Sequence, residues 1–286
     1  MSTRICLVAL IGLPAAGKSR FSRWILSIPQ QQFNVIHLCY DDFLPAQDDT
    51  LNAEIELKLQ RSKILANINS LICELNDNAY IARDIIKSVK LSEKCNDFLI
   101  LCDDNNYYRS MRYKLYQLCR QNKCAYAQIY LECDLKLALS RNSARPDNER
   151  VSEEILQRME IRLERPNSAK HHWEENTLFL EGCDNFAIMK AGILDFLSKS
   201  LDKIVQPLTQ SVTTTETVVS LLHQLDLLLR KRIGEILRLE NDTAERSKRS
   251  KMLIAKRKAI LQEVRKKVEK ESISIDDLDI YVYFLN

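Results

Sequence analysis

The residues with the clearest chemistry form an octapeptide near the N-terminus, GLPAAGKS at Gly12–Ser19. It matches G-x-x-x-x-G-K-[ST] at every fixed position, a pattern whose glycines let backbone amides surround phosphate groups. In such loops the lysine, here Lys18, reaches the β- and γ-phosphates, and the hydroxyl of Ser19 can bind Mg²⁺. The sequence therefore predicts a nucleotide site made of Gly12, Leu13, Pro14, Ala15, Ala16, Gly17, Lys18 and Ser19.

Two acidic doublets follow apolar segments further along the chain. Asp41-Asp42 come directly after Phe33–Tyr40, and Asp103-Asp104 come after Phe98–Cys102. Ligands of a parallel sheet lie beyond the carboxyl ends of its strands, so both doublets are expected near the phosphate loop. The first could accept a proton from a substrate hydroxyl or orient it, and the second has the pattern of a carboxylate linked to Mg²⁺. A turn or helix-cap role for the first doublet is the open alternative, because loop-forming residues follow it.

A pair of arginines is the third candidate feature. Arg141 and Arg145 lie four residues apart in a segment, 134–146, that we predict to be a helix ended by Pro146. Their spacing places both guanidinium groups on one helix face, where they could close over transferring phosphates as part of a lid. Two arginines on an ordinary solvated face are the alternative.

Apolar segments alternate with helical patterns over the first two hundred residues, which predicts an α/β fold. We expect a parallel sheet with helices on both faces. Residues 76–96 are ambiguous, and a short helix over Ile81–Val89 followed by a polar connector is one interpretation. The predicted strands are Ile5–Ile11, Phe33–Tyr40, Phe98–Cys102, Ala125–Cys133 and Thr177–Gly182.

The positive charge of the chain is concentrated near its C-terminus. Residues 228–270 hold fifteen lysines and arginines against six carboxylates, a net charge of +9 in a chain whose total is +3. A polar stretch near Pro207 indicates a boundary between a nucleotide-binding domain, 1–206, and a helical domain, 207–286. We expect the latter to be a hairpin with a polar turn at Glu240–Ser247 and its basic residues turned outward. A solvated helix pair or a partner-binding coiled coil are alternatives to an anionic partner, and the tail could pack on either domain.

The cysteine pattern bears on the compartment. The chain has nine cysteines and no C-x-x-C pair, which is typical of free thiols in a reducing environment. No apolar run approaches the roughly 20 residues that span a bilayer, and the N-terminus reads as a core strand. We expect a cytoplasmic protein.

Together the motifs resemble the L-seryl-tRNA(Sec) kinase family, also called phosphoseryl-tRNA(Sec) kinases. The resemblance spans roughly residues 5–180. It rests on GLPAAGKS, on YDD at Tyr40–Asp42, on DDNNYYRSMRYKLYQL at Asp103–Leu118, on IYLECDLKLALSRNSARP with its R-x-x-x-R, and on ERPNSAKHHWEENTL at Glu164–Leu178. The C-terminal hairpin is similar only in being helical and basic.

The resemblance implies a P-loop kinase that uses ATP and Mg²⁺ to phosphorylate the serine of seryl-tRNA(Sec), a precursor step in selenocysteine synthesis. It implies that Lys18 and Ser19 hold the triphosphate and metal, and that Asp103 and Asp104 supply the carboxylate of the metal site. Asp41 becomes the base or hydroxyl-orienting group, with Asp42 as its substitute. Arg141 and Arg145 neutralise charge on the transferring phosphoryl group, and the basic C-terminal helices bind tRNA.

Two other classes of protein share parts of this pattern. A tRNA-dependent regulatory ATPase associated with the Elongator complex has a similar nucleotide domain, but that family typically reads DSLNYIKGFRY where this chain reads DDNNYYRSMRY. A small-metabolite P-loop kinase shares the phosphate loop and lid, yet a small substrate needs no helical appendage with a charge of +9. Both alternatives are less favoured.

Overall fold

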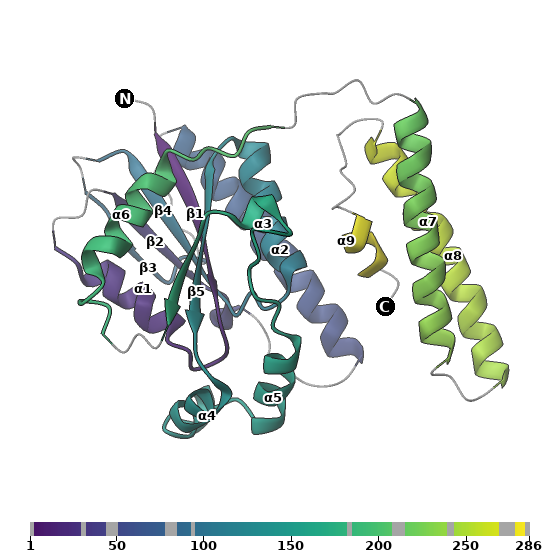
Figure 1. Ribbon diagram of the computed structural model, residues 1–286, viewed down its shortest axis with the longest axis horizontal. Helices are drawn as coiled ribbons and strands as arrows, with labels where there is room; N and C mark the ends of the chain where they lie inside the picture. The colour runs from purple at the N-terminus through teal and green to yellow at the C-terminus, as the bar shows by residue number, and fades with distance from the viewer. Residues whose placement is uncertain are drawn as a thin grey trace. The chain divides into compact units, whose positions relative to one another are not determined.

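The computed structural model describes residues 3–29, 33–43, 51–77, 85–92, 95–181, 185–207, 215–238, 243–268 and 278–283. The chain divides into two compact units, Met1–Pro207 and Leu208–Asn286, which are described separately below (Figure 1). No helix within these residues is long and apolar enough to cross a membrane.

A six-stranded sheet forms the centre of the first unit. Its strand order is β3-β2-β4-β1-β5-β6. Four pairs of neighbouring strands are parallel, as the alternation of elements predicts: β1 with β4, β1 with β5, β2 with β4, and β5 with β6. The strands are β1 (Arg4–Ile11), β2 (Asn34–Cys39), β3 (Ser88–Lys90), β4 (Asp97–Asp103), β5 (Ala125–Glu132) and β6 (Thr177–Glu181).

The edge strand β3 corrects two expectations. It pairs antiparallel with β2, with Val89 opposite Ile36, so the sheet is not wholly parallel. Residues 88–90 are therefore a strand where a short helix over Ile81–Val89 was one interpretation; residues 81–84 lie outside the described ranges. A strand of three residues is too short to show the alternation by which strands are recognised in a sequence.

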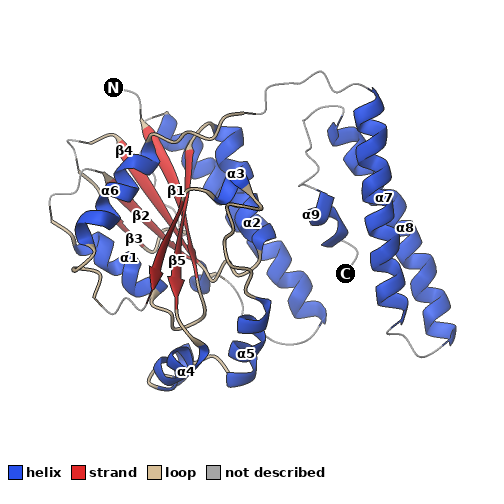
Figure 2. Cartoon of the chain, viewed as in Figure 1, coloured by secondary structure: helices blue, strands red, loops and turns tan. Residues whose placement is uncertain are grey.

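Helices cover both faces of the sheet (Figure 2). Because successive side chains of a strand point to opposite faces, Val8 packs with Phe21 on one side and Leu7 packs with Ile68 on the other. Burial on both faces explains why the strands read as continuous apolar runs. The helices are α1 (Lys18–Ser27) and α6 (Lys190–Leu201) on the first side, and α2 (Leu51–Asn76) and α3 (Arg109–Asn122) on the second.

Two short helices, α4 (Leu135–Ser143) and α5 (Glu153–Arg162), follow the carboxyl end of β5 (Figure 1). Asp134 and Ser152 cap their N-termini through side-chain oxygens that accept from the backbone amides of Leu137 and Ile155. The first helix ends at Ser143 and not at Pro146, because the residue before a proline is sterically excluded from the α conformation. Arg145 therefore lies beyond the helix that carries Arg141, which corrects the expectation that one helix face presents both.

The second unit is built from α7 (Thr215–Arg238), α8 (Thr243–Val268) and α9 (Leu278–Tyr283). The first two form the expected hairpin around an apolar cluster that includes Leu225, Leu253 and Val264. Because α8 begins at Thr243, most of the predicted polar turn at Glu240–Ser247 is helical. The first turns of this helix are exposed and rich in charged residues, so their sequence resembles that of a polar loop. Leu278 of α9 joins the same cluster, so this part of the tail packs with the hairpin.

Candidate active site

The phosphate loop joins β1 to α1 in the conformation that its glycines permit. Gly12 has φ 151°, and a Cβ there would lie 2.7 Å from the carbonyl oxygen of Leu131, so no side chain fits. Gly17 has φ 103° and caps α1, whose first residue is Lys18. Between them Ala15 adopts φ 63°, which costs a residue with a Cβ about 1 kcal/mol or more. The loop is therefore held in a strained turn at a helix N-terminus, where an anion is favourably bound.

The side chain of Lys18 is held by carbonyl groups of the phosphate loop. Its Nζ donates to the carbonyl oxygens of Gly12 at 3.0 Å and Leu13 at 2.7 Å. Burial lowers the pKa of Lys18, while the negative charges of Asp103, Asp104 and Asp41 oppose that shift. The charges of three of the four aspartates in the two acidic doublets, Asp41, Asp103 and Asp104, thus act on the loop lysine.

The two aspartates of the first doublet lie in a short turn, Tyr40–Asp42, directly after β2. Partial burial and the nearby charge of Asp104 raise the pKa of Asp41, whereas Lys18 and Arg145 act in the opposite direction. Asp42 instead forms an ion pair with Lys87, with Oδ1 and Nζ 2.8 Å apart. Of the two carboxylates, that of Asp41 is therefore the one whose charge is coupled to the phosphate loop lysine.

Asp103 and Asp104 have different partners, although they are adjacent in sequence. Oδ2 of Asp103 lies 2.9 Å from Nε2 of His37, a buried residue of β2 that also meets the hydroxyl of Ser88 through Nδ1 at 3.3 Å. No hydrogen bond from another described residue reaches Oδ1 of Asp103.

Both carboxylate oxygens of Asp104 are bound by the guanidinium group of Arg61 on α2, one of them with Nη2 and Oδ1 3.2 Å apart. Burial alone would raise the pKa of Asp104, but the positive charge and hydrogen bonds of Arg61 hold it below its ordinary value. Sequence reasoning found Asp103 and Asp104 and missed His37 and Arg61. Only the fold brings these partners, 66 and 43 residues away, to the aspartates.

The two arginines of the R-x-x-x-R segment are placed differently. The positive charge of Arg145 acts on both Lys18 and Asp41 and lowers the pKa of each. Arg141 donates from Nη1 to Sγ of Cys133, 3.8 Å away. The charge of Arg145 is therefore coupled to Lys18 and Asp41, whereas Arg141 contacts the residue that follows β5.

A family model described as "Chromatin associated protein KTI12" matches residues 5–278, nearly the whole chain. The chain belongs to the KTI12 family.

Several curated proteins are similar to this KTI12-family chain over most of its length. An L-seryl-tRNA(Sec) kinase of Mus musculus is 28% identical over 280 residues, which cover 84% of this chain and 77% of the relative. An L-seryl-tRNA(Sec) kinase of Methanococcus maripaludis is 23% identical over 274 residues, and the match covers 96% of this chain and 95% of the relative. Among solved structures, Chaetomium thermophilum Kti12 in complex with ADP-AlF3 has 18% identity and a TM-score of 0.49, over 68% of this chain and 98% of that one.

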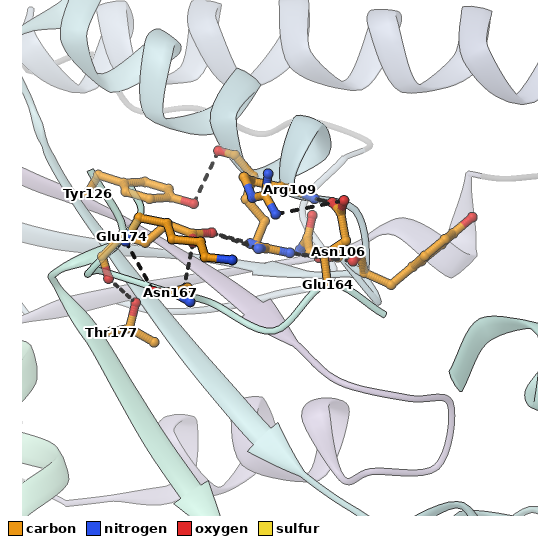
Figure 3. Close-up of polar contacts among 10 residues, drawn as sticks. Asn106, Arg109, Tyr126, Glu164, Asn167, Glu174 and Thr177 are labelled. Carbon is orange, nitrogen blue, oxygen red and sulfur yellow. Dashed lines mark hydrogen bonds and ion pairs between the residues drawn. The ribbon is translucent and has the colours of Figure 1, made fainter. Parts of the chain in front are cut away.

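A buried polar cluster joins two of the sequence segments on which the resemblance rests. Arg112 of α3 is 0% exposed and Glu174 is 1% exposed, and Nη2 of the arginine lies 2.6 Å from Oε1 of the glutamate. Figure 3 shows Glu174, Asn106 and Glu164 gathered in this cluster. Neither Arg112 nor Glu174 was singled out from the sequence, although each lies inside a quoted motif.

The hairpin of the KTI12-family chain presents most of its basic side chains to solvent. Arg257 is an exception that corrects the expected outward orientation: it donates from Nε to Asp226 of α7 at 2.5 Å, and its side chain is 20% exposed. Burial would raise the pKa of Asp226, but Arg257 and Arg230 together hold it below its ordinary value. The exposed basic residues of α7 and α8 are Arg230, Lys231, Arg238, Arg246, Lys248, Arg249, Lys251, Lys256, Lys258, Arg265 and Lys266.

Proposed function

We propose that this protein is an ATP- and Mg²⁺-dependent kinase that phosphorylates the serine hydroxyl of seryl-tRNA(Sec), giving O-phosphoseryl-tRNA(Sec) for selenocysteine synthesis. The observation that carries the proposal is the position of Asp41 at the carboxyl end of β2, in the same parallel sheet as the strand that leads into the phosphate loop. Its carboxylate has a raised pKa and is electrostatically coupled to Lys18. A base beside the phosphate loop is what transfer to a hydroxyl requires. The relatives named L-seryl-tRNA(Sec) kinase, which align with most of this chain, support that acceptor.

The residues of the loop fit a nucleoside triphosphate and its metal ion. Gly12 and Gly17 leave backbone amides uncovered by side chains, and Lys18 opens a helix of ten residues whose N-terminus faces the loop. Ser19 and Oδ1 of Asp103 would hold Mg²⁺, with Asp104 beside them in its pair with Arg61. When bound, Mg²⁺ supplies charge neutralisation to the β- and γ-phosphates.

The transfer step assigns one task to each of these residues. Asp41 accepts the proton of the serine hydroxyl as its oxygen attacks the γ-phosphorus. The new oxygen–phosphorus bond forms as the bond to the β,γ-bridging oxygen breaks, and ADP leaves with the negative charge that develops on that oxygen. Lys18 stabilises that charge, and Arg145, assisted by Arg141, neutralises the equatorial oxygens of the phosphoryl group.

The helical unit is the proposed site of tRNA binding. Its exposed lysines and arginines suit the phosphates of an A-form stem, whose narrow major groove keeps side chains away from the base edges. Recognition would then depend on shape, phosphates and 2′-hydroxyl groups. The basic surface adds affinity, while the active site selects the aminoacylated end.

A regulatory, tRNA-stimulated ATPase is the second candidate function. The observation in its favour is that the family model matching residues 5–278 is that of KTI12. Such a protein would use Lys18, Ser19 and Asp103 in the same way and would activate water in place of a serine hydroxyl. A small-metabolite kinase is the third candidate, and the exposed basic surface of the hairpin disfavours it.

One experiment separates these functions. The protein is incubated with γ-labelled ATP and Mg²⁺ together with seryl-tRNA(Sec), with seryl-tRNA(Ser), or without RNA, and the label is followed into phosphoserine and free phosphate. Label in phosphoserine only with seryl-tRNA(Sec) supports the kinase. Release of free phosphate that tRNA stimulates, without labelled serine, assigns the regulatory ATPase. No response to either tRNA contradicts both and favours a small acceptor.

A further inference from the structure

Arg112 and Glu174 form an ion pair with almost no contact with water. Nε and Nη2 of Arg112 donate to Oε1 of Glu174 at 3.1 and 2.6 Å, and Oε2 of Glu174 accepts from the backbone amide of Asn167 at 2.8 Å. The two side chains are 0% exposed. Both oxygens of the carboxylate are thus bound, and the charges compensate each other inside the first unit.

The remaining nitrogen of the guanidinium group reaches the loop that follows β4. Nη1 of Arg112 donates to the carbonyl oxygen of Asn106 at 3.0 Å and lies 3.5 Å from that of Tyr107. Asn106 and Tyr107 follow Asp103 and Asp104 after one intervening residue, Asn105. The arginine therefore holds the backbone immediately downstream of the two carboxylates.

The same loop is attached to the phosphate loop. Nδ2 of Asn106 donates to the carbonyl oxygen of Leu10 at 2.8 Å. The backbone amide of Gly12 donates to the carbonyl oxygen of Asn105 at 3.2 Å. Asn106 is 2% exposed and has φ 44°, a left-handed conformation that asparagine tolerates better than most residues. These two hydrogen bonds consequently fix the segment that follows the acidic doublet against the phosphate loop and the strand before it.

Glu164 attaches the segment after α5 to the same place. Its amide donates to the carbonyl oxygen of Tyr107 at 2.8 Å, and its Oε2 accepts from the amide of Arg109 at 2.5 Å (Figure 3). The segment from Glu164 to Glu174 is thus held at both ends. Glu164 binds the backbone after β4, and Glu174 binds Arg112, which holds that same backbone.

Stability alone is a weak reason for such a pair. Removing two charges from water is costly, and replacing a buried ion pair with apolar residues of similar size is often neutral or stabilising. Apolar residues could fill the volume of Arg112 and Glu174, but they could not donate to the carbonyl groups of Asn106 and Tyr107. The ion pair therefore fixes the orientation of the backbone at Asn106 and Tyr107 in addition to filling space.

We propose that Arg112 and Glu174 are positioning residues that set the orientation of Asp103 toward Mg²⁺ bound with the nucleotide. The inference rests on the proposed function, in which Asp103 holds the metal. Groups that orient metal ligands without touching the metal typically contribute 10- to 100-fold in metal affinity or activity. Arg112 and Glu174 act in this way through the loop that Asn106 anchors.

The test uses the full chain with Arg112→Met and Glu174→Leu combined, so that no buried charge is left unpaired. Dissociation constants for an ATP analogue are measured with Mg²⁺ and with EDTA, together with the thermal unfolding temperature. We expect a folded protein with a moderately lowered unfolding temperature, because the carbonyl group of Asn106 and the amide of Asn167 lose their partners. Binding of the analogue in EDTA should stay within about threefold, and the gain in affinity that Mg²⁺ provides should fall at least about tenfold. Arg120→Met, which removes an arginine from the last turn of the same helix, is the matched control and should leave the gain unchanged.

Asn106→Gly is the second variant, because glycine accepts the left-handed backbone while the side-chain hydrogen bond to Leu10 is removed. It should show the same selective loss of the Mg²⁺ gain, and it decides the question if the double variant does not fold. A Mg²⁺ gain retained by folded Asn106→Gly or by the folded double variant overturns the positioning role. Absence of any Mg²⁺ gain in the unaltered protein would instead contradict the proposed function.

Discussion

The nucleotide-binding unit and the helical hairpin use charge in different ways. Lys18, Asp103 and Asp104 are each less than a tenth exposed and have defined partners, whereas most basic side chains of α7 and α8 lie in water. A charge buried beside its partner is poorly screened by salt, and loss of one partner leaves the other uncompensated. Exposed charges are screened and act as a group. The comparison predicts large, salt-insensitive effects in the first unit and small, salt-dependent effects in the second.

The largest expected effect is that of Asp41→Asn. Removing a general base should lower phosphoryl transfer by about 10²- to 10⁴-fold, while ATP binding changes little because Asp41 does not belong to the phosphate loop. Single-turnover transfer and nucleotide binding measure the two quantities separately. Asp42→Asn is the matched control, since Asp42 is paired with Lys87. Equal losses of transfer in the two variants would remove the distinction between the adjacent aspartates.

Lys18→Ala should follow, with turnover lowered by about 10²- to 10³-fold, the scale of one preorganised charge at a transition state. The effect should persist at high salt because Lys18 is buried. Transfer assays at two ionic strengths measure it, and Lys190→Ala, an exposed lysine at the start of α6, serves as control. Near-normal turnover in folded Lys18→Ala would contradict the phosphate-loop assignment.

The pH dependence of transfer tests the coupling between the two acidic doublets. Asp41 must be ionised to accept a proton, and its raised pKa means that the rate falls, as pH is lowered, sooner than it would for an ordinary aspartate. Asp104→Asn removes a negative charge that raises the pKa of Asp41, so the acid limb should move to lower pH. The single-turnover rate measured across pH reports this shift, and an acid limb that moves to higher pH would show that Asp104 does not act on Asp41 in this way.

Exposed charges on the hairpin should give a smaller, salt-dependent effect. Lys251→Gln combined with Lys258→Gln should weaken tRNA binding and reduce the slope of log K against log salt by roughly 1.5 units, somewhat under one unit for each phosphate that is no longer neutralised. Arg257→Gln is the contrasting variant, because Arg257 pairs with Asp226 across the hairpin. It should instead lower the free energy of unfolding by about 1 kcal/mol. A slope that stays constant in the double variant would assign the basic surface to another partner.

The smallest effect concerns an exception within the first unit. Gln128 of β5 is 0% exposed, and neither atom of its amide group has a hydrogen-bond partner among the described residues. Leaving a polar group unpaired costs free energy, so Gln128→Met should raise the free energy of unfolding by about 1 kcal/mol. Denaturant unfolding measures it. Asn176→Leu is the control and should destabilise, because Asn176 donates to the carbonyl oxygen of Tyr126 at 2.8 Å.

The sequence predicted those features that depend on neighbours in the chain. The apolar runs of β1, β2, β4, β5 and β6 and the phosphate loop were found because each is a continuous pattern. β3 was missed because three residues carry no period, and the start of α8 was missed because its first turns bury little surface. Within the site, Asp41 and Asp103 were found at strand ends. Arg61 and His37 were not, since no local pattern connects residues that only the tertiary fold brings together.

The distance along the chain between Arg112 and Glu174 has a consequence for synthesis. The loop that carries Asp103 and Asp104 is complete when the ribosome passes Asn106, but the carboxylate that holds Arg112 is added 62 residues after that arginine. At 5–20 residues per second this interval lasts about 3 to 12 seconds. At the end of this interval β1, β4 and β5 have all been synthesised, while Arg112 still lacks its counter-charge. On the positioning role proposed above, the gain in nucleotide binding that Mg²⁺ provides is therefore acquired late in translation, when the segment before β6 emerges.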